Sequence, residues 1–96
     1  MKILRNIEIN TTAKIDAIIT YCVPWGYHGL ALWVGGEIFT AGGSKVAITL
    51  VPGAGGVFIV TLNGETVYDK SLENRYPILP DIKIIKDKVI SLITNI

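Results

Sequence analysis

Hydrophobic and polar positions follow two different periods along the chain, and the changes of period predict its elements. Residues 15–21 form a run rich in β-branched side chains, typical of a central strand buried on both faces. From Tyr27 onward, apolar positions recur at helical spacing until Gly42-Gly43. This stripe comprises Leu30, Ala31, Val34, Ile38 and Ala41. Residues 45–51 predict a second strand, parallel to the first because a helix connects them.

The next part of the chain has the pattern of a β-hairpin. A glycine-rich loop over residues 52–56 precedes two strand patterns, 57–62 and 65–69, which Asn63-Gly64 separates. Asn-Gly between two strands is a strong hairpin signal, because a type I′ turn needs positive φ at both central residues. The sequence therefore predicts that the third and fourth strands are antiparallel neighbours.

A helix is expected at the end of the chain. Residues 70–80 are expected to form a loop, after which Asp81 caps this helix. Its inward face comprises Ile82, Ile85, Val89, Leu92, Ile93 and Ile96, and its outward face comprises Lys83, Lys86, Asp87 and Lys88. A βαβ half joined to a ββα half predicts the α/β class: a thioredoxin-like two-layer sandwich whose mixed four-stranded sheet has the spatial order 2-1-3-4.

The length and composition indicate one domain that has more apolar surface than it can bury. Of 96 residues, 50% are hydrophobic and 18% charged, which excludes a disordered chain. We assign the domain to residues 15–96 and treat residues 1–14 as an N-terminal extension. Ile3, Ile7 and Ile9 alternate with polar residues there and predict an additional strand. We expect a homo-oligomer, a dimer, formed through this extension or through the first helix, whose outer side carries Leu32, Trp33, Gly36 and Phe39.

The charge pattern argues against two classes of partner. The net charge is +1, and basic and acidic residues are interspersed, so there is neither a basic stripe for nucleic acid nor a polybasic patch for membranes. No apolar run approaches the roughly 20 residues that span a bilayer. Arg5 and Glu8 interrupt the start of the chain, unlike the hydrophobic region of a signal peptide. We therefore expect a cytoplasmic protein.

Cys22 is the only cysteine and the main candidate for chemistry. It ends the first strand pattern, and Pro24 fits the first turn of the helix that follows. Free N–H groups and the positive end of the dipole at a helix start favour the thiolate, the reactive form of cysteine. The alternative is a buried cysteine that acts as a small hydrophobic residue. One histidine and one cysteine do not supply a zinc site.

Four segments resemble landmarks of the selenoprotein W, T and H family, also called Rdx. They are residues 21–27, residues 52–58, the turn Asn63-Gly64-Glu65, and residues 74–77, and the resemblance spans residues 15–93. It implies a thioredoxin-like fold and thiol or selenol redox activity at a CxxC or CxxU site. It also implies an association with glutathione and with protein partners.

The chain departs from this family at the second redox position, which Trp25 occupies. A dithiol cycle within one chain is therefore impossible, and Cys22 needs an external thiol to resolve its mixed disulfide or sulfenic acid. We expect no tightly bound cofactor, with glutathione or another small thiol as co-substrate. Two hypotheses stay open: monothiol redox chemistry at Cys22, or a non-catalytic protein-interaction module that retains the fold.

Several residues around Cys22 are candidates for substrate binding. They are Val23, Pro24, Trp25, Tyr27, Pro52 and Gly53. Trp25 offers a flat surface to an adduct, or else it shields the sulfur. Pro52 and Gly53 belong to a loop that is either the counterpart of the cis-proline loop of thioredoxins or an ordinary turn. His28 is expected to be a solvated helix residue, and Arg75 either a solvated loop residue or a ligand for a carboxylate.

Overall fold

A computed structural model of the chain describes residues 11–95. The elements are β1 (Ile15–Cys22), α1 (His28–Gly42), the 3-10 turn η2 (Gly43–Lys45), β2 (Val46–Gly53), β3 (Phe58–Leu62), β4 (Glu65–Asp69), α2 (Lys70–Glu73) and α3 (Leu79–Thr94). The strand predicted in the extension lies outside the described residues. Residues 11–14 are described, and Thr12 and Lys14 donate hydrogen bonds to the carbonyls of Ser44 and Lys45, both at 2.7 Å.

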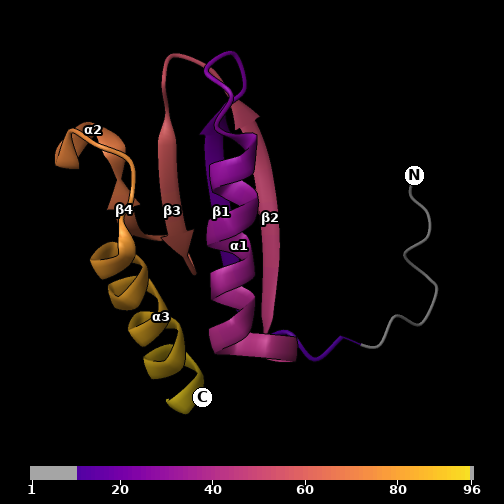
Figure 1. The fold of residues 1–96 in the computed structure, drawn as a ribbon. Helices are drawn as coiled ribbons and strands as arrows, with labels where there is room; N and C mark the ends of the chain where they lie inside the picture. Colours follow the sequence, from indigo (N-terminus) through magenta and orange to yellow (C-terminus); the bar gives the residue numbers. More distant parts are fainter. Residues whose placement is uncertain (1–10, 96) are drawn as a thin grey trace, which may run out of the picture.

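The sheet has the predicted order β2-β1-β3-β4 (Figure 1). β1 is parallel to β2 and antiparallel to β3, and β3 is antiparallel to β4. Asn63 and Gly64 adopt φ values of 50° and 84°, which confirms the predicted hairpin turn. Asn63 also accepts a hydrogen bond from Asp16 N–H at its side chain, 2.9 Å, and so connects the turn to β1. The molecule is a two-layer, thioredoxin-like α/β sandwich.

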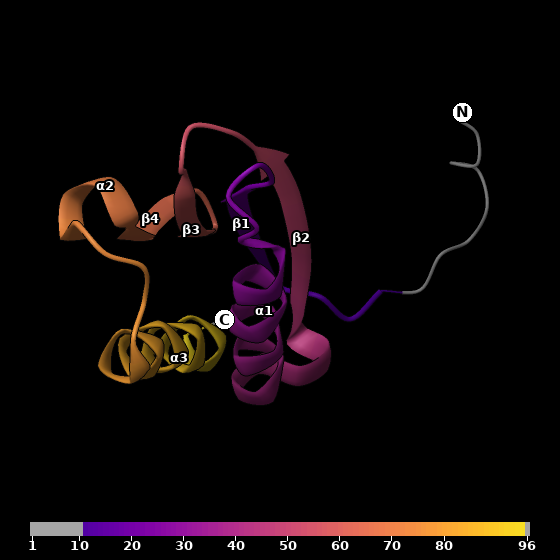
Figure 2. The same cartoon turned by 45° about the horizontal axis from the view of Figure 1, so that its top comes forward.

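Both long helices cover the same face of the sheet (Figure 2). The prediction that β1 is buried on both faces is therefore wrong. Ile15, Ala17 and Ile19 are fully or almost fully buried beneath the helices, whereas Asp16 and Ile18 point to the open face, where Ile18 is 37% exposed. β1 is central in the sheet but has only one covered face, so alternate side chains reach solvent.

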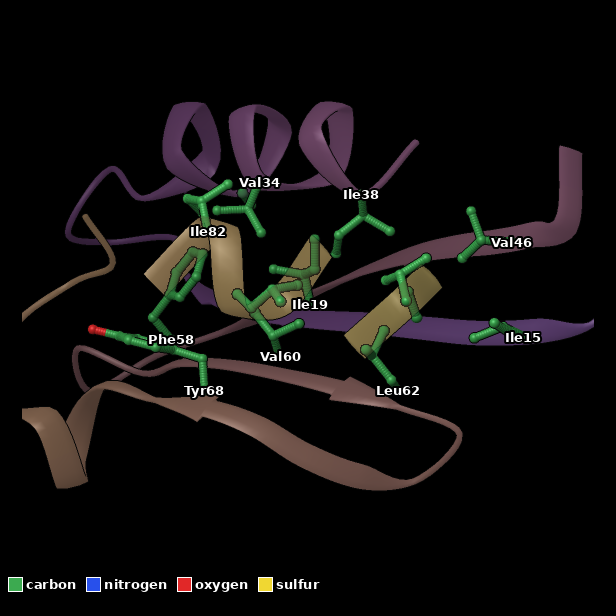
Figure 3. Close-up of a cluster of buried hydrophobic side chains, with 14 residues drawn as sticks. Ile15, Ile19, Val34, Ile38, Val46, Phe58, Val60, Leu62, Tyr68 and Ile82 are labelled. Carbon is green, nitrogen blue, oxygen red and sulfur yellow. The ribbon is translucent and has the colours of Figure 1, made fainter. Parts of the chain in front are cut away.

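The core fills the space between the helices and this covered face. Figure 3 shows Ile19 and Val60 from the sheet and Val34 and Ile38 from α1 pointing into the same layer. The predicted stripe of α1 is confirmed for Ala31, Val34 and Ile38, which are fully buried, while Leu30 and Ala41 are half-buried. Gly43 ends the helix with φ 54°, as the sequence indicates.

The predicted loop over residues 70–80 is wrong at both of its ends. It begins with the short helix α2, for which the Asp69 side chain accepts a hydrogen bond from Ser71 N–H at 2.9 Å. α3 begins at Leu79, so Asp81 is the third helical residue rather than the cap. Pro80 fits this first turn because its missing N–H has no partner there. The carboxylate of Asp81 still accepts from Ile78 N–H, at 2.9 Å.

The predicted faces of α3 are confirmed in part. Ile82, Ile85 and Val89 are buried, Leu92 and Ile93 are half-buried, and Ile96 lies outside the described residues. On the outward side Lys83 and Asp87 are exposed and form an ion pair. Lys86 and Lys88 are only partly exposed, because they pair with Glu37 of α1 and Glu65 of β4. No helix among residues 11–95 is both long and apolar enough to cross a membrane.

Candidate thiol site at the end of strand β1

Cys22 is the last residue of β1, at the carboxyl end of a central strand, and it is a free cysteine. Its N–H donates to the carbonyl of Val57 at 2.9 Å, and its own carbonyl accepts from Tyr27 N–H at 3.1 Å. In the sheet it pairs with Gly53 of β2. Three segments of the chain therefore hold the backbone of Cys22 in place.

The side chain of Cys22 has no exposed surface. It nevertheless stands apart from the main core cluster, in which Tyr21 is a partly buried member. Alternation along β1 directs Cys22 to the face opposite Tyr21, away from the helices. Reagents in solution therefore reach the sulfur only when the neighbouring segments move.

The prediction that the helix begins directly after Cys22, with Pro24 in its first turn, is wrong. Residues 23–27 form a turn, closed by a hydrogen bond of 2.9 Å from Gly26 N–H to the carbonyl of Val23, and Gly26 has φ 78°. α1 begins only at His28, after this turn, and His28 is exposed. A turn of five residues therefore separates Cys22 from the first helical residue, although the N-cap of α1, Tyr27, still donates its N–H to the Cys22 carbonyl at 3.1 Å.

Trp25 lies over the loop between β2 and β3. Its indole is 59% exposed, and its edge packs against Gly56, where an added Cβ would lie 2.7 Å from indole Cζ3. Trp25 also meets Tyr27 edge to face, with ring centroids 6.0 Å apart. Gly56 has φ 78°, a conformation that favours glycine. The chain thus provides both the space and the backbone conformation that this tryptophan needs.

Pro52 and Gly53 belong to β2 and not to a loop, which corrects the prediction for residues 52–56. They pair with Tyr21 and Cys22, and Gly53 also accepts a hydrogen bond from Val23 N–H at 3.0 Å. The loop between the strands is confined to residues 54–57. The described residues contain no cis peptide bond, so Val51–Pro52 is trans. Val23 and Pro24 are exposed in the turn after Cys22.

Lys70 is a site residue that the sequence analysis did not identify. Its ammonium group lies 5.2 Å from the ring centroid of Trp25 and 5.9 Å from that of Tyr27. Trp25 and Lys70 are far apart in sequence, and no periodicity connects them. The hairpin signal at Asn63-Gly64 could have found Lys70, because a hairpin brings the end of β4 beside the start of β3.

Arg75 is engaged within the protein. Its Nη1 donates to Asp81 Oδ2 at 2.6 Å, and its carbonyl accepts from the Tyr68 hydroxyl. The hydrogen bond to Asp81 raises the pKa of Arg75. Burial, followed by the nearby Asp81 carboxylate, raises the pKa of Tyr68. This cluster links β4 to the start of α3, and its contacts favour a structural role over carboxylate binding.

The described residues hold no group of three His, Cys, Asp or Glu side chains close enough to bind a metal ion.

A comparison with protein families matches residues 17–90 to the Rdx family. The chain belongs to the Rdx family. The matched segment contains Cys22, Trp25 and Lys70, so the site lies inside the Rdx domain.

Two solved structures resemble this Rdx protein. A selenoprotein W-related protein from Vibrio cholerae is 26% identical, with a TM-score of 0.72, and the match covers 83% of this chain and 98% of that one. A protein from Bordetella parapertussis is 29% identical, with a TM-score of 0.70 and coverage of 78% and 92%. None of the curated proteins compared with the chain matches it. Family and fold together indicate a redox-type protein.

Proposed function

We propose that the protein is a selenoprotein W-like thiol redox protein that acts by monothiol chemistry at Cys22, in the cytoplasm. The observation that supports this most directly is the position of Cys22 at the carboxyl end of the central strand of an Rdx domain. Because Cys22 is the only cysteine, the resolving thiol comes from another molecule, glutathione or a partner protein.

The proposed reaction has two exchanges. The Cys22 thiolate attacks one sulfur of a disulfide, an S–S bond forms to Cys22, and the other sulfur leaves as a thiolate. An external thiolate then attacks the sulfur of the bound half, which forms a new disulfide and releases the Cys22 thiolate. With a peroxide, the thiolate attacks one oxygen and the O–O bond breaks, which gives a sulfenic acid and an alkoxide or hydroxide that takes a proton from water. A thiol then condenses with the sulfenic acid, which forms a disulfide to Cys22 and releases water, and a second thiol releases the Cys22 thiolate by exchange.

Because Cys22 is fully buried, the first exchange requires a local opening. Two segments border Cys22: the turn over residues 23–27 and the loop over residues 54–57. The contact between Trp25 and Gly56 connects these two segments. Local openings of loops cost much less free energy than global unfolding. Within this proposal, Trp25 and its neighbours Val23, Pro24, Tyr27, Pro52 and Gly53 surround the entering substrate.

Mass spectrometry of the folded protein after exposure to oxidised glutathione tests the proposal. We expect one glutathionyl adduct, absent in Cys22→Ser and removed by reduced glutathione. We also expect Trp25→Ala to speed alkylation of Cys22 by roughly ten-fold, the factor that corresponds to about 1.4 kcal/mol of lost closing free energy. Trp33→Ala serves as the control: it removes the second tryptophan of the chain, which lies in α1, and should leave the alkylation rate unchanged.

A second candidate function is a non-catalytic protein-interaction module. The contrast between a fully buried Cys22 and a largely exposed Trp25 favours it. The same measurements decide between the two. If Cys22 reacts only after urea has unfolded the chain, and no glutathionyl adduct forms on the folded protein, the redox proposal is wrong and the interaction module remains.

A further inference from the structure

A cavity of about 300 Å³ lies beside the thiol site, between the start of β3 and the end of β4. Two segments line it, residues 55–59 and residues 69–71. Its volume is at the lower end of the range for small-molecule sites, so it suits a compact ligand rather than a protein segment. Trp25 stands at its border, because the indole packs against Gly56, one of the lining residues.

The cavity is next to the strand end that carries Cys22. Val57 lines the cavity, and its carbonyl accepts the hydrogen bond from Cys22 N–H. Gly53, the strand partner of Cys22, also packs closely on Val57, where an added Cβ would lie 2.9 Å from Val57 Cγ1. A molecule held in this cavity is therefore placed beside the segment that is hydrogen-bonded to the backbone of Cys22.

Lys70 gives the cavity a positive charge that no described carboxylate pairs with. Among residues 11–95, Lys83, Lys86 and Lys88 form ion pairs, whereas Lys70 forms none. The one acidic lining residue, Asp69, forms no ion pair with Lys70; its Oδ1 accepts hydrogen bonds from Ser71 N–H at 2.9 Å and from Ser71 Oγ at 2.7 Å. Lys70 is a half-buried residue, and its ammonium group lies over the Trp25 ring, which restricts its position.

We propose that this cavity is a binding subsite for a small organic carboxylate that carries the disulfide or thiol exchanged at Cys22. Lys70 pairs with the carboxylate, and the half-buried lining residues Val57 and Ile59 contact the carbon chain between the carboxylate and the sulfur. The inference rests on the proposed function and adds the charge and size of the substrate. In the exchange, Cys22 Sγ bonds to one sulfur of the anionic disulfide while the other leaves as a thiolate and takes a proton from water.

Binding is first measured without chemistry, in the full-length Cys22→Ser protein. Dithiodipropionate serves as the anionic probe and hydroxyethyl disulfide as its neutral analogue, and NMR follows the Gly56 and Ser71 amides and the Trp25 indole N–H. We expect saturable shifts with dithiodipropionate, and roughly five-fold weaker binding of the neutral probe. Lys70→Gln should remove the difference, whereas Lys70→Arg should keep it.

Lys45→Gln is the matched control, because it removes the same charge at the opposite end of the sheet, before β2 begins. It should leave the preference for the anionic probe unchanged. The inference is overturned if dithiodipropionate gives no saturable shifts at these three groups. It is equally overturned if Lys70→Gln and Lys45→Gln have the same effect.

Exchange kinetics with Cys22 intact separate this inference from the proposed function. We expect mixed-disulfide formation to be fastest with dithiodipropionate, slower with hydroxyethyl disulfide and slowest with the cationic cystamine, and Lys70→Gln to flatten this order. Equal rates for all three in the unaltered protein contradict the subsite but leave the redox function intact. Anion-selective binding in Cys22→Ser, with no exchange in the unaltered protein, supports the subsite and contradicts the redox function.

Discussion

Gly42, the last residue of α1, has no room for a side chain. An added Cβ would lie 2.8 Å from Val46 Cγ1 and 3.1 Å from Val89 Cγ1, so α1 meets both β2 and α3 at this point. The approach to Val46 is closer than two carbon atoms can come without a shift, the approach to Val89 is tight, and both valines are buried in the core cluster. The absence of a side chain at Gly42 therefore sets how closely three elements pack.

Gly42→Ala should lower the free energy of unfolding by about 1–3 kcal/mol, the usual cost of overpacking a well-filled core. Gly29→Ala is the control: it lies in the same helix, its Cβ would meet nothing within 4 Å, and it should raise the free energy by about 0.4–1 kcal/mol. Urea unfolding followed by circular dichroism measures both. Equal effects of the two substitutions would show that packing at Gly42 is not the cause.

For individual residues, the sequence predicted the place within a strand or helix better than it predicted burial and side-chain contacts. It placed Cys22 at the carboxyl end of a central strand and Gly42-Gly43 at the end of a helix, because local patterns fix both. It could not show that Cys22 is buried or that Trp25 packs on Gly56, since both depend on contacts between segments distant in sequence.

The first turn of α3 is joined to the segment before it by one carboxylate. Asp81 accepts hydrogen bonds from Ile78 N–H and from Arg75, whose Nη1 lies 2.6 Å from Asp81 Oδ2. Burial acts to raise the pKa of Asp81, but the hydrogen bonds from Arg75 and Ile78 outweigh it, and the pKa lies below its usual value. A negative charge in the first helical turn is also favoured by the helix dipole.

The sign of the pH dependence follows from this lowered pKa. Asp81 stabilises the fold at pH values above the pKa of the unfolded chain, near 4, and this contribution is lost as the pH falls through the lower pKa of the folded state. Asp81→Asn should therefore cost about 0.5–1 kcal/mol at pH 7 and much less at pH 2. Asp87→Asn, further along α3 in an exposed pair with Lys83, should have a smaller effect at pH 7.

Urea unfolding at a series of pH values checks this prediction. The difference between the unaltered protein and Asp81→Asn is the quantity to follow, because other carboxylates change both proteins alike. A difference that stays constant from pH 7 to pH 2 would contradict an ionic role for Asp81.

Among the elements, the sequence predicted those with enough residues to show a period. The four strands and the two long helices were found with nearly correct bounds. α2 was missed because four residues do not display a helical period. The turn over residues 23–27 was predicted as helix because proline is favoured both in a first helical turn and in a tight turn. Gly26 was the residue in the sequence that indicated a turn, and the structure gives it a positive φ.

Two faces of the molecule each carry a pair of exposed apolar side chains. On α1, Leu32 and Phe39 are 61% and 59% exposed and lie two turns apart on the same side, with the exposed Gly36 between them. On the opposite side of the molecule, Ile18 and Val51 lie on the open face of the sheet. Part of the surplus of apolar surface inferred from the composition therefore lies where another chain can cover it.

We expect the protein to form a dimer through the exposed face of α1. Gly36 lets a second backbone approach closely, and Leu32 and Phe39 supply the apolar contact. Association removes these two side chains from water, which stabilises the dimer.

Light scattering should give twice the chain mass at micromolar concentration and a lower mass on dilution. The double substitution Leu32→Ser and Phe39→Ser should give a monomer that keeps its fold, because neither side chain belongs to the core. Leu72→Ser, which removes a leucine that is 76% exposed on α2, should leave the dimer intact. A single-chain mass at every concentration would contradict the dimer, and a dimer that survives the double substitution would exclude α1 as its interface.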